Sequence, residues 1–290
     1  MGLVLLDSIA SGILTGGVYG LIAVGLSLIF GVMRVLNFAH GDFIMLAMYM
    51  AFFLSVFSGL IPLLALPLVI AVFFLFGVGV YVGVLKRIVA APTLSQVFLT
   101  FGLSLVLENA ANIVFGSNYR NIITPYSGKV VSLLNLVTMS LSYLIAFSIS
   151  VVVMISLSIF LARTKLGMAV RAVAQDVESA ILLGIDVERV RTFTFGLGIA
   201  LAGGAGVLLA TVYYIYPYVA MPLTINAFII TVLGGMGSIP GAMLGGIILG
   251  VTQSVAPLYT PTGFQQLWGL VMFLLILRLK PSGLLGRSKT

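Results

Sequence analysis

Long apolar stretches separated by short polar intervals run through the whole chain. A helix needs about 20 apolar residues to cross the hydrocarbon core of a bilayer. Candidate spans cover 8–32, 43–58, 60–85, 94–115, 140–162, 193–214, 225–257 and 264–280. The pattern predicts a single transmembrane domain over residues 1–290, an all-α polytopic membrane protein with discontinuous segments. It has eight or nine crossings, depending on whether 8–58 crosses once or twice.

The longest polar interval is RTKLGMAVRAVAQDVESAILLGIDVERVRT, residues 163–192. As a helix, it carries an apolar stripe on one face, formed by Val170, Val173, Val177 and Ile181. Gly184 is predicted to end this helix with a positive φ, and Asp186 to cap the helix that follows. The pattern fits both an interfacial helix at the lipid headgroups and a docking element for a cytoplasmic partner.

Composition supports the membrane class and excludes several kinds of site. Hydrophobic residues make up 61% of the chain and charged residues 7%, whereas soluble domains carry roughly a quarter charged residues. The chain has no cysteine, which excludes disulfides and thiolate metal ligands. His40 is the only histidine and has no carboxylate cluster around it in the sequence, so we expect no metal site.

The distribution of basic residues predicts which loops face the cytoplasm. Eleven of the fourteen Lys and Arg residues lie just after residue 85, in 163–191, or near the C-terminus. The positive-inside rule places these regions, including the C-terminus, in the cytoplasm and 116–139 outside as a short strand or loop element. For both ends of the region after 192 to be cytoplasmic, 225–257 must turn back at its glycine-rich middle. Basic residues at membrane boundaries do not indicate nucleic-acid binding.

Two intervals interrupt the apolar sequence without resembling ordinary loops. They are GVMRVLNFAHGDF at 31–43 and GGMGSIPGAMLGG at 234–246. Irregular backbone at membrane depth is tolerated where it is buried in protein or lines a watery cavity, and paired interruptions are typical of transport pathways. The alternative is a tight cytoplasmic turn. Because ionisable residues near a bilayer are usually functional, we expect Asn37, His40 and Asp42 to lie beside a pathway.

A further polar patch lies inside the predicted span 94–115. It contains Glu108, Asn109 and Asn112, of which Glu108 and Asn112 share one helix face at i, i+4. Such a patch either lines a pathway or forms hydrogen bonds between helices, and the sequence does not separate these two roles.

Small residues recur at a spacing of four. The positions are Gly12, Gly16 and Gly20, then Gly79 and Gly83, then Gly237, Gly241 and Gly245. This spacing lets helix backbones approach closely in lipid, so tight packing between helices is the expected role of all of them.

Several of these motifs together resemble a known family. The run GLIAVGLSLIFGVMRVLNFAHGDFIMLAMY (20–49) is similar to the N-terminal signature of bacterial branched-chain amino-acid ABC permeases of the LivH type. Residues 171–206 resemble the cytoplasmic loop and following span of that family, and 228–250 and 277–286 resemble its C-terminal half. Glu178, Ser179 and Ala180, followed by Gly184, are similar to the EAA-type loop of ABC importer permeases.

The resemblance implies a permease subunit of an ABC importer in the bacterial inner membrane. Such a subunit works with a related second permease, two cytoplasmic ATPases and an extracytoplasmic binding protein. ATP is bound by the ATPases, so the permease itself is expected to have no cofactor and no enzymatic activity. The segment 163–192 becomes the coupling element that docks on an ATPase, through Arg171, Asp176, Glu178, Ser179, Ala180 and Gly184. Related permeases import urea or short amides, which is the alternative substrate class.

Two other functions compete with this interpretation. A stand-alone secondary transporter would pair acidic residues inside the membrane with a coupling ion, and Glu108 alone lies clearly within a predicted span. An intramembrane hydrolase would need a base beside a nucleophile motif, and none accompanies His40. The chain also has no G-x-x-x-x-G-K-[ST] run for binding phosphate.

The cysteine-free sequence allows the predicted orientation to be tested by single-cysteine labelling. A membrane-impermeant reagent should label cysteines placed in 163–192 or 284–290 only from the cytoplasmic side. Cysteines replacing Tyr119 or Ser127 should react only from outside. Labelling at Ser127 from the cytoplasm would reverse the orientation.

Overall fold

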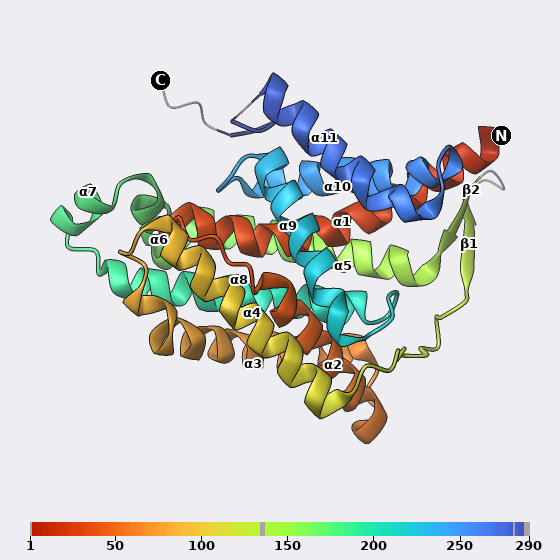
Figure 1. Ribbon diagram of the computed structural model, residues 1–290, viewed down its shortest axis with the longest axis horizontal. Coiled ribbons are helices and arrows are strands. Elements are labelled where there is room, and N and C mark those ends of the chain that lie inside the picture. The colour runs from red at the N-terminus through yellow and green to blue at the C-terminus, as the bar shows by residue number, and fades with distance from the viewer. Residues whose placement is uncertain (1, 134–136, 281, 287–290) are drawn as a thin grey trace.

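The computed structural model describes residues 2–133, 137–280 and 282–286, and these are mostly helical (Figure 1). The helices are α1 (Gly2–Met33), α2 (His40–Ser58), α3 (Pro62–Gly83), α4 (Thr93–Phe115), α5 (Leu141–Arg163), α6 (Lys165–Gln175), α7 (Val177–Leu182), α8 (Val187–Leu209), α9 (Ala220–Gly234), α10 (Ile239–Val255) and α11 (Gln265–Leu279). Short 3-10 turns are η1 (Leu85–Arg87), η2 (Pro217–Val219), η3 (Ala256–Leu258) and η4 (Thr262–Phe264). Strands β1 (Val130–Leu133) and β2 (Val137–Ser140) form a hairpin.

The helical spans agree with the predicted multi-pass architecture. In the described part of the chain, eight helical segments are long and apolar enough to cross a membrane, and the 15-residue α11 is a shorter apolar helix. The stretch 8–58 forms two helices, α1 and α2. The stretch 225–257 divides into α9 and α10 at a turn where Gly235 and Gly237 have φ angles of 98° and 85°. The predicted reversal at the glycine-rich middle is therefore confirmed.

The helix α1 lies at the centre of the bundle and contacts α5, α8, α9 and α10. Its contact with α10 depends on glycine: a Cβ on Gly16 would lie 2.6 Å from the carbonyl oxygen of Gly246. A Cβ on Gly246 would lie 2.5 Å from the carbonyl oxygen of Gly16. Because neither helix has a side chain here, the two backbones touch directly. Gly12 and Gly20 continue this contact, as predicted.

The packing role predicted for Gly79 and Gly83 is wrong. A Cβ at either position would meet no atom within 4 Å, whereas a Cβ on Gly77 of the same helix would lie 3.0 Å from the Cα of Gly196 in α8. The helix α3 therefore uses a different face to contact α8. Spacing alone indicates a small-residue face, but not which side of the helix meets a neighbour.

The polar interval 163–192 is divided into two helices instead of the single predicted one. Asp176 lies between α6 and α7 with extended backbone angles, φ −153° and ψ 114°, and its side chain accepts hydrogen bonds from the amides of Glu178 and Ser179. This local cap competes with a continuous helix. The phase of the apolar stripe changes at the break, so Val173 is buried while Ile181 is 58% exposed.

The ends of this interval form as predicted. Gly184 has a φ of 77°, and the side chain of Asp186 accepts a hydrogen bond of 3.1 Å from the amide of Arg189 at the start of α8. In Figure 1, α6 and α7 lie at one end of the long axis and the β1–β2 hairpin lies at the other. We call these the α7 end and the hairpin end.

The hairpin forms within the predicted strand or loop element. Val131 pairs with Met139, and the amide of Thr138 donates a hydrogen bond of 2.8 Å to Asp7 of α1. This bond fastens the hairpin to the start of the central helix. Arg287 and Lys289, which were predicted to lie in the cytoplasm, are outside the described residues.

Replacing Gly246 by Val should separate α1 from α10. The new side chain would overlap the backbone of Gly16 and Gly20, which we expect to reduce the free energy of unfolding by about 1–3 kcal/mol. Thermal unfolding in detergent measures the change. Gly79→Val is the matched control because that position is open, and equal melting temperatures for the two variants would contradict the packing interpretation.

Candidate functional site

The chain folds back on itself between α1 and α2. The helix α1 ends at Met33, and Arg34 has a positive φ of 55°, rare for a residue other than glycine. His40, the first residue of α2, is fully buried and its Nε2 lies 3.0 Å from the carbonyl oxygen of Ile22. Ile22 is about 16 Å back along α1 from Met33, given the 1.5 Å rise per residue. The segment 34–39 therefore returns alongside α1, and α2 begins inside the bundle.

The helix α9 begins beside the same point. The hydroxyl of Thr224, in its first turns, accepts a hydrogen bond of 2.9 Å from the amide of Gly41. The same oxygen lies 3.1 Å from the carbonyl oxygen of Ala220 and 3.3 Å from that of Phe38. A Cβ on Gly41 would overlap the carbonyl oxygen of Ala220. We call this meeting of residues 37–42 with 217–224 the junction.

The three candidate residues of the first interruption all lie at the junction and are fully buried. The Oδ1 of Asn37 accepts a hydrogen bond of 3.2 Å from the amide of Ala39, which stabilises the turn before α2. Both carboxylate oxygens of Asp42 lack a hydrogen-bond partner among the described residues, as does Nδ1 of His40. Buried polar atoms are normally paired, so these atoms have unused capacity for water or a passing ligand.

The polar patch of α4 reaches the junction in part. Ser104 and Glu108 of α4 lie near the carboxylate of Asp42, and Glu108 is half-buried. The Nδ2 of Asn112 donates a hydrogen bond of 3.3 Å to the hydroxyl of Tyr218 in η2, so it joins α4 to the segment before α9. Asn109 is exposed and donates to the carbonyl of Leu105 in its own helix. Of the three predicted residues, Glu108 and Asn112 therefore adjoin the junction, and Asn109 does not.

Several residues of this region were not predicted. Thr224 and Thr100 satisfy backbone atoms of the interruption, and the Thr100 hydroxyl donates a hydrogen bond of 2.9 Å to the carbonyl of Leu36. Ser27 accepts a hydrogen bond of 3.0 Å from the amide of Gly237 at the second interruption. Isolated hydroxyl residues in apolar spans carry no distinguishing pattern, so sequence analysis had no signal to select them.

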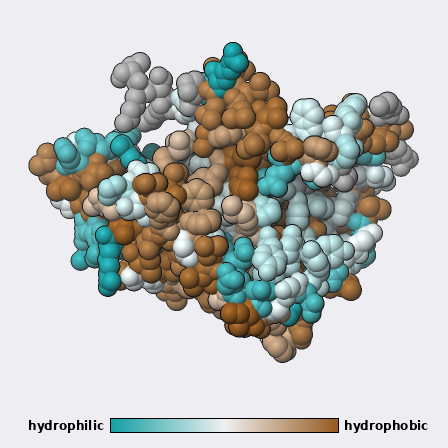
Figure 2. Space-filling model, in the orientation of Figure 1, coloured by the Kyte–Doolittle hydropathy of each residue, from teal (hydrophilic) through white to brown (hydrophobic). Residues whose placement is uncertain are grey.

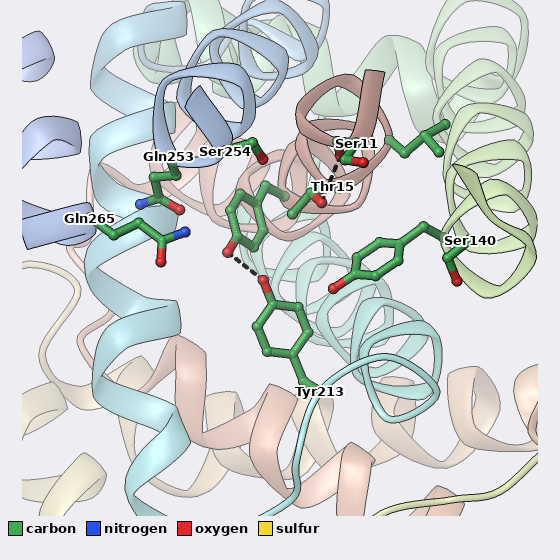
Figure 3. Close-up of a pocket in the computed structure, with 10 residues that line it drawn as sticks. Ser11, Thr15, Ser140, Tyr213, Gln253, Ser254 and Gln265 are labelled. Atoms are coloured by element: carbon green, nitrogen blue, oxygen red, sulfur yellow. Dashed lines mark hydrogen bonds between the residues drawn. The ribbon is translucent and has the colours of Figure 1, made fainter. Parts of the chain in front are cut away.

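A polar cavity of about 250 Å³ is lined in part by Ser140 of β2 and therefore lies toward the hairpin end. Figure 3 shows its lining residues. The hydroxyls of Tyr19 and Tyr213 are 2.8 Å apart beside it. Its lining is mostly hydroxyl and amide groups and contains no charged side chain: Ser11, Leu14, Thr15, Tyr19, Ser140, Tyr143, Tyr213, Gln253, Ser254 and Gln265. Gln253 also donates to Asn226 of α9 at 3.1 Å, which links the cavity wall to the helix that forms the junction.

Near the hairpin end, Arg120 fixes the loop that follows α4. Its guanidinium donates a hydrogen bond of 2.6 Å to the carbonyl of Phe115 and lies 5.3–5.8 Å from the ring centroids of Tyr49, Phe52 and Phe53. The backbone of Arg120 also pairs with Ile215, just before η2. One residue thus joins α2, the loop after α4 and the segment leading to α9.

The predicted coupling residues cluster at the α7 end. Hydrogen bonds from the Ser179 hydroxyl and amide and from the Glu178 amide lower the pKa of the exposed Asp176 carboxyl. This cap therefore persists at neutral pH and is lost only as pH falls through that lowered value. Glu178 and Ser179 are exposed, whereas Ala180 is buried and contributes packing instead of contact surface.

Two other features define the α7 end. Arg171 is exposed and donates a hydrogen bond of 3.2 Å to the carbonyl of Ala162, so it ties α6 to the end of α5. Ile181, Leu182 and Leu183 form an exposed apolar tip, with Leu182 88% exposed. An apolar tip of this kind on a projecting element is typical of a contact surface. Gly184 closes the turn directly after it.

Comparison with known proteins identifies the family. Residues 8–279 match the model of the family described as branched-chain amino acid transport system, permease component. The chain belongs to this permease family. The permease is 31% identical to the high-affinity branched-chain amino acid transport permease protein LivH of Salmonella typhimurium, over 98% of this chain and 96% of that protein. It is 33% identical to BraD of Pseudomonas aeruginosa over the same shares.

A third relative is a different permease protein of the same kind of system. LivM of Escherichia coli is 31% identical over 131 residues, which is 44% of this chain and 30% of that protein. No solved structure matches the permease. The resemblance inferred from the sequence motifs is therefore confirmed at the level of the family, and the family consists of transport subunits, not enzymes.

Replacing Thr224 by Val should destabilise the junction. The substitution keeps the side-chain shape but leaves the buried amide of Gly41 without its acceptor, a loss of about 1–3 kcal/mol in the free energy of unfolding. Thr252→Val is the control, because that hydroxyl bonds only to Ile248 within its own helix. If both variants unfold at the same temperature in detergent, Thr224 does not hold the two helices together.

Proposed function

We propose that this permease is the transmembrane subunit of an ATP-driven ABC importer that carries branched-chain amino acids across the bacterial cytoplasmic membrane. The observation that carries the proposal is the family match over nearly the whole chain, including relatives named for branched-chain amino acid transport. Import of urea or short amides by the same machinery is the alternative. The names of the matched relatives favour amino acids.

The junction is the proposed pathway site of the permease. Two helices, α2 and α9, begin there inside the bundle, and their N-termini concentrate positive partial charge. In transporters, half-helix N-termini of this kind face anionic groups of the substrate. We propose that Asn37, His40 and Asp42, with Glu108 and Asn112 of α4, form the polar side of the pathway. An amino acid carries one ammonium and one carboxylate group. A pathway wall that has both hydrogen-bond donors and a carboxylate can contact both of these groups.

A second permease subunit is proposed to cover the exposed polar face. Figure 2 shows that hydrophilic and weakly polar residues gather on the front face toward the hairpin end, beside the hydrophobic α11. Asn109 of α4 and Tyr218 of η2 are exposed, and polar side chains facing lipid hydrocarbon are unfavourable. A related permease or a watery path removes that cost. The partial match to LivM supports a related permease as the partner.

The α7 end is proposed to dock on one of two cytoplasmic ATPase subunits, which bind the ATP. The exposed apolar tip at Ile181–Leu183 supplies contact area, and Glu178 and Arg171 supply charge around it. This assigns the α7 end and the C-terminus to the cytoplasm. It assigns the hairpin end to the side from which an extracytoplasmic binding protein delivers the substrate. We propose no cofactor for the permease itself.

The docking proposal predicts uncoupling without loss of folding. Gly184→Val places a β-branched side chain at a φ of 77°, which costs about 1–2 kcal/mol locally and re-orients the tip. Reversing the charge of Glu178 changes the contact surface, and reversing that of Arg171 also removes its hydrogen bond to the carbonyl of Ala162. Reconstituted complexes carrying either change should lose leucine uptake or its coupling to ATP hydrolysis while the permease remains inserted.

The control for this experiment is Gly128→Val, because Gly128 has a similar φ of 76° in open space at the opposite end. It should retain uptake and ATPase coupling. Full uptake and coupling in the Gly184 and charge-reversal variants would reduce 163–192 to an interfacial element. Uptake of urea but not of leucine by the wild-type complex would select the alternative substrate.

A further inference from the structure

An apolar groove runs along α8 between α3 and α5. It has a volume of about 350 Å³, and α8 forms its floor from Phe193 to Leu208. Its walls come from Leu66 and Ile70 of α3 and from a face of α5 that includes Val152 and Phe160. Ser156 is the single polar residue in the lining. The groove therefore offers a hydrocarbon surface that follows the helix axis.

A charged pocket of about 480 Å³ continues the groove at the α7 end. Phe193 lines both, and Phe74 and Val78 of α3 extend the wall formed by Ile70 and Leu66. The polar lining consists of Lys86, Asp186, Glu188, Arg189 and Thr192. Groove and pocket share Phe193 and follow one another along the seam of α3 and α8, the groove apolar and the pocket ionic, and we call the two together the slot.

The charges of the pocket balance within two ion pairs. Lys86 Nζ lies 3.4 Å from Glu188 Oε1, and Arg189 Nε lies 2.8 Å from Asp186 Oδ2. The Arg189 side chain is 89% exposed, and those of Lys86, Asp186 and Glu188 are 51%, 50% and 39% exposed. Both pairs are therefore open to solvent, and each group can exchange its partner for a ligand group. The pocket is thus complementary to a headgroup that carries one anion and one cation side by side. It is not complementary to a simple anion, which the two carboxylates would repel.

The shape of the groove suits a linear apolar occupant. From Phe193 to Leu208 the floor is about 22 Å long, given the rise of 1.5 Å per residue. The volume of about 350 Å³ is spread along this length. A single acyl chain is linear and apolar, and it matches the lining along the whole floor.

We propose that the slot binds one bilayer phospholipid with a zwitterionic, primary-amine headgroup, drawn from the leaflet at the α7 end. An acyl chain lies along α8 between α3 and α5. The phosphate contacts Lys86 and Arg189, and the ammonium donates hydrogen bonds to Glu188 and Asp186. A choline headgroup has no N–H to donate, and a phosphoglycerol headgroup has no cation, so both bind more weakly.

Lipid binding is tested on the full-length chain in detergent, alone and with its partner subunits, by native mass spectrometry. The probes are dioleoyl phosphatidylethanolamine, phosphatidylcholine and phosphatidylglycerol. We expect one phosphatidylethanolamine per chain, bound about tenfold more tightly than the other two, which corresponds to ~1.4 kcal/mol. Equal binding of all three lipids would overturn the headgroup assignment. Loss of the lipid when the partner subunits join would assign the groove to a protein interface and overturn the proposal.

The acyl-chain site is tested by Gly204→Leu. A Cβ at Gly204 would lie 3.4 Å from Ile70, an ordinary contact, and the rest of the leucine would project into the groove. We expect at least tenfold weaker lipid binding. Gly79→Leu is the control on the open face of α3 and should bind as wild type does. Equal lipid binding by the two variants would show that the groove is not the site.

The headgroup site is tested independently by Lys86→Gln and Glu188→Gln, both at partly exposed side chains. Glu188→Gln should reduce the preference for phosphatidylethanolamine over phosphatidylcholine several-fold, because Glu188 accepts a hydrogen bond from the ammonium. Lys86→Gln should weaken the binding of both lipids several-fold, because both carry the phosphate. The control is Lys129→Gln at the exposed hairpin end. An unchanged preference in the Glu188 variant together with unchanged affinities in the Lys86 variant would remove the ionic pocket from the proposal.

Discussion

The need to satisfy backbone hydrogen bonds inside an apolar bundle governs this structure. Wherever a helix is interrupted at depth, its free amides and carbonyls require a partner that hydrocarbon cannot supply. Side-chain hydroxyls of the permease supply these partners. Those of Thr224 and Ser27 accept hydrogen bonds from the amides of Gly41 and Gly237, and that of Thr100 donates to the carbonyl of Leu36. Each of these bonds joins two different elements, so the same contacts that make the interruptions tolerable also fix where α2 and α9 begin.

The position of the junction depends in turn on close backbone packing. Glycine brings α10 directly against α1, and α1 carries the carbonyl of Ile22 against which His40 is positioned. Because backbone atoms make the contact between α1 and α10, changes of side-chain rotamer cannot adjust it. The polar groups that remain free at the junction, such as the carboxylate of Asp42, are therefore held in place without being consumed by local hydrogen bonds.

Local sequence predicted the spans, the turn between α9 and α10 and the caps at Gly184 and Asp186, because each depends on neighbouring residues. It failed at Asp176, where a side chain able to cap a helix interrupted a stripe that periodicity alone continued. It could not find Thr224, whose partner Gly41 lies 183 positions away. Local sequence identified the polar residues of the interruptions but not the residues they contact, because a contact between distant spans produces no pattern in the sequence of either span.

Arg120 anchors the loop after α4 without a carboxylate partner among the described residues. Its guanidinium is held by three aromatic rings and a backbone carbonyl instead. Acidification therefore removes no partner from this anchor. The link between α2, the loop after α4 and the approach to α9 remains in place across conditions that would loosen an ordinary ion pair.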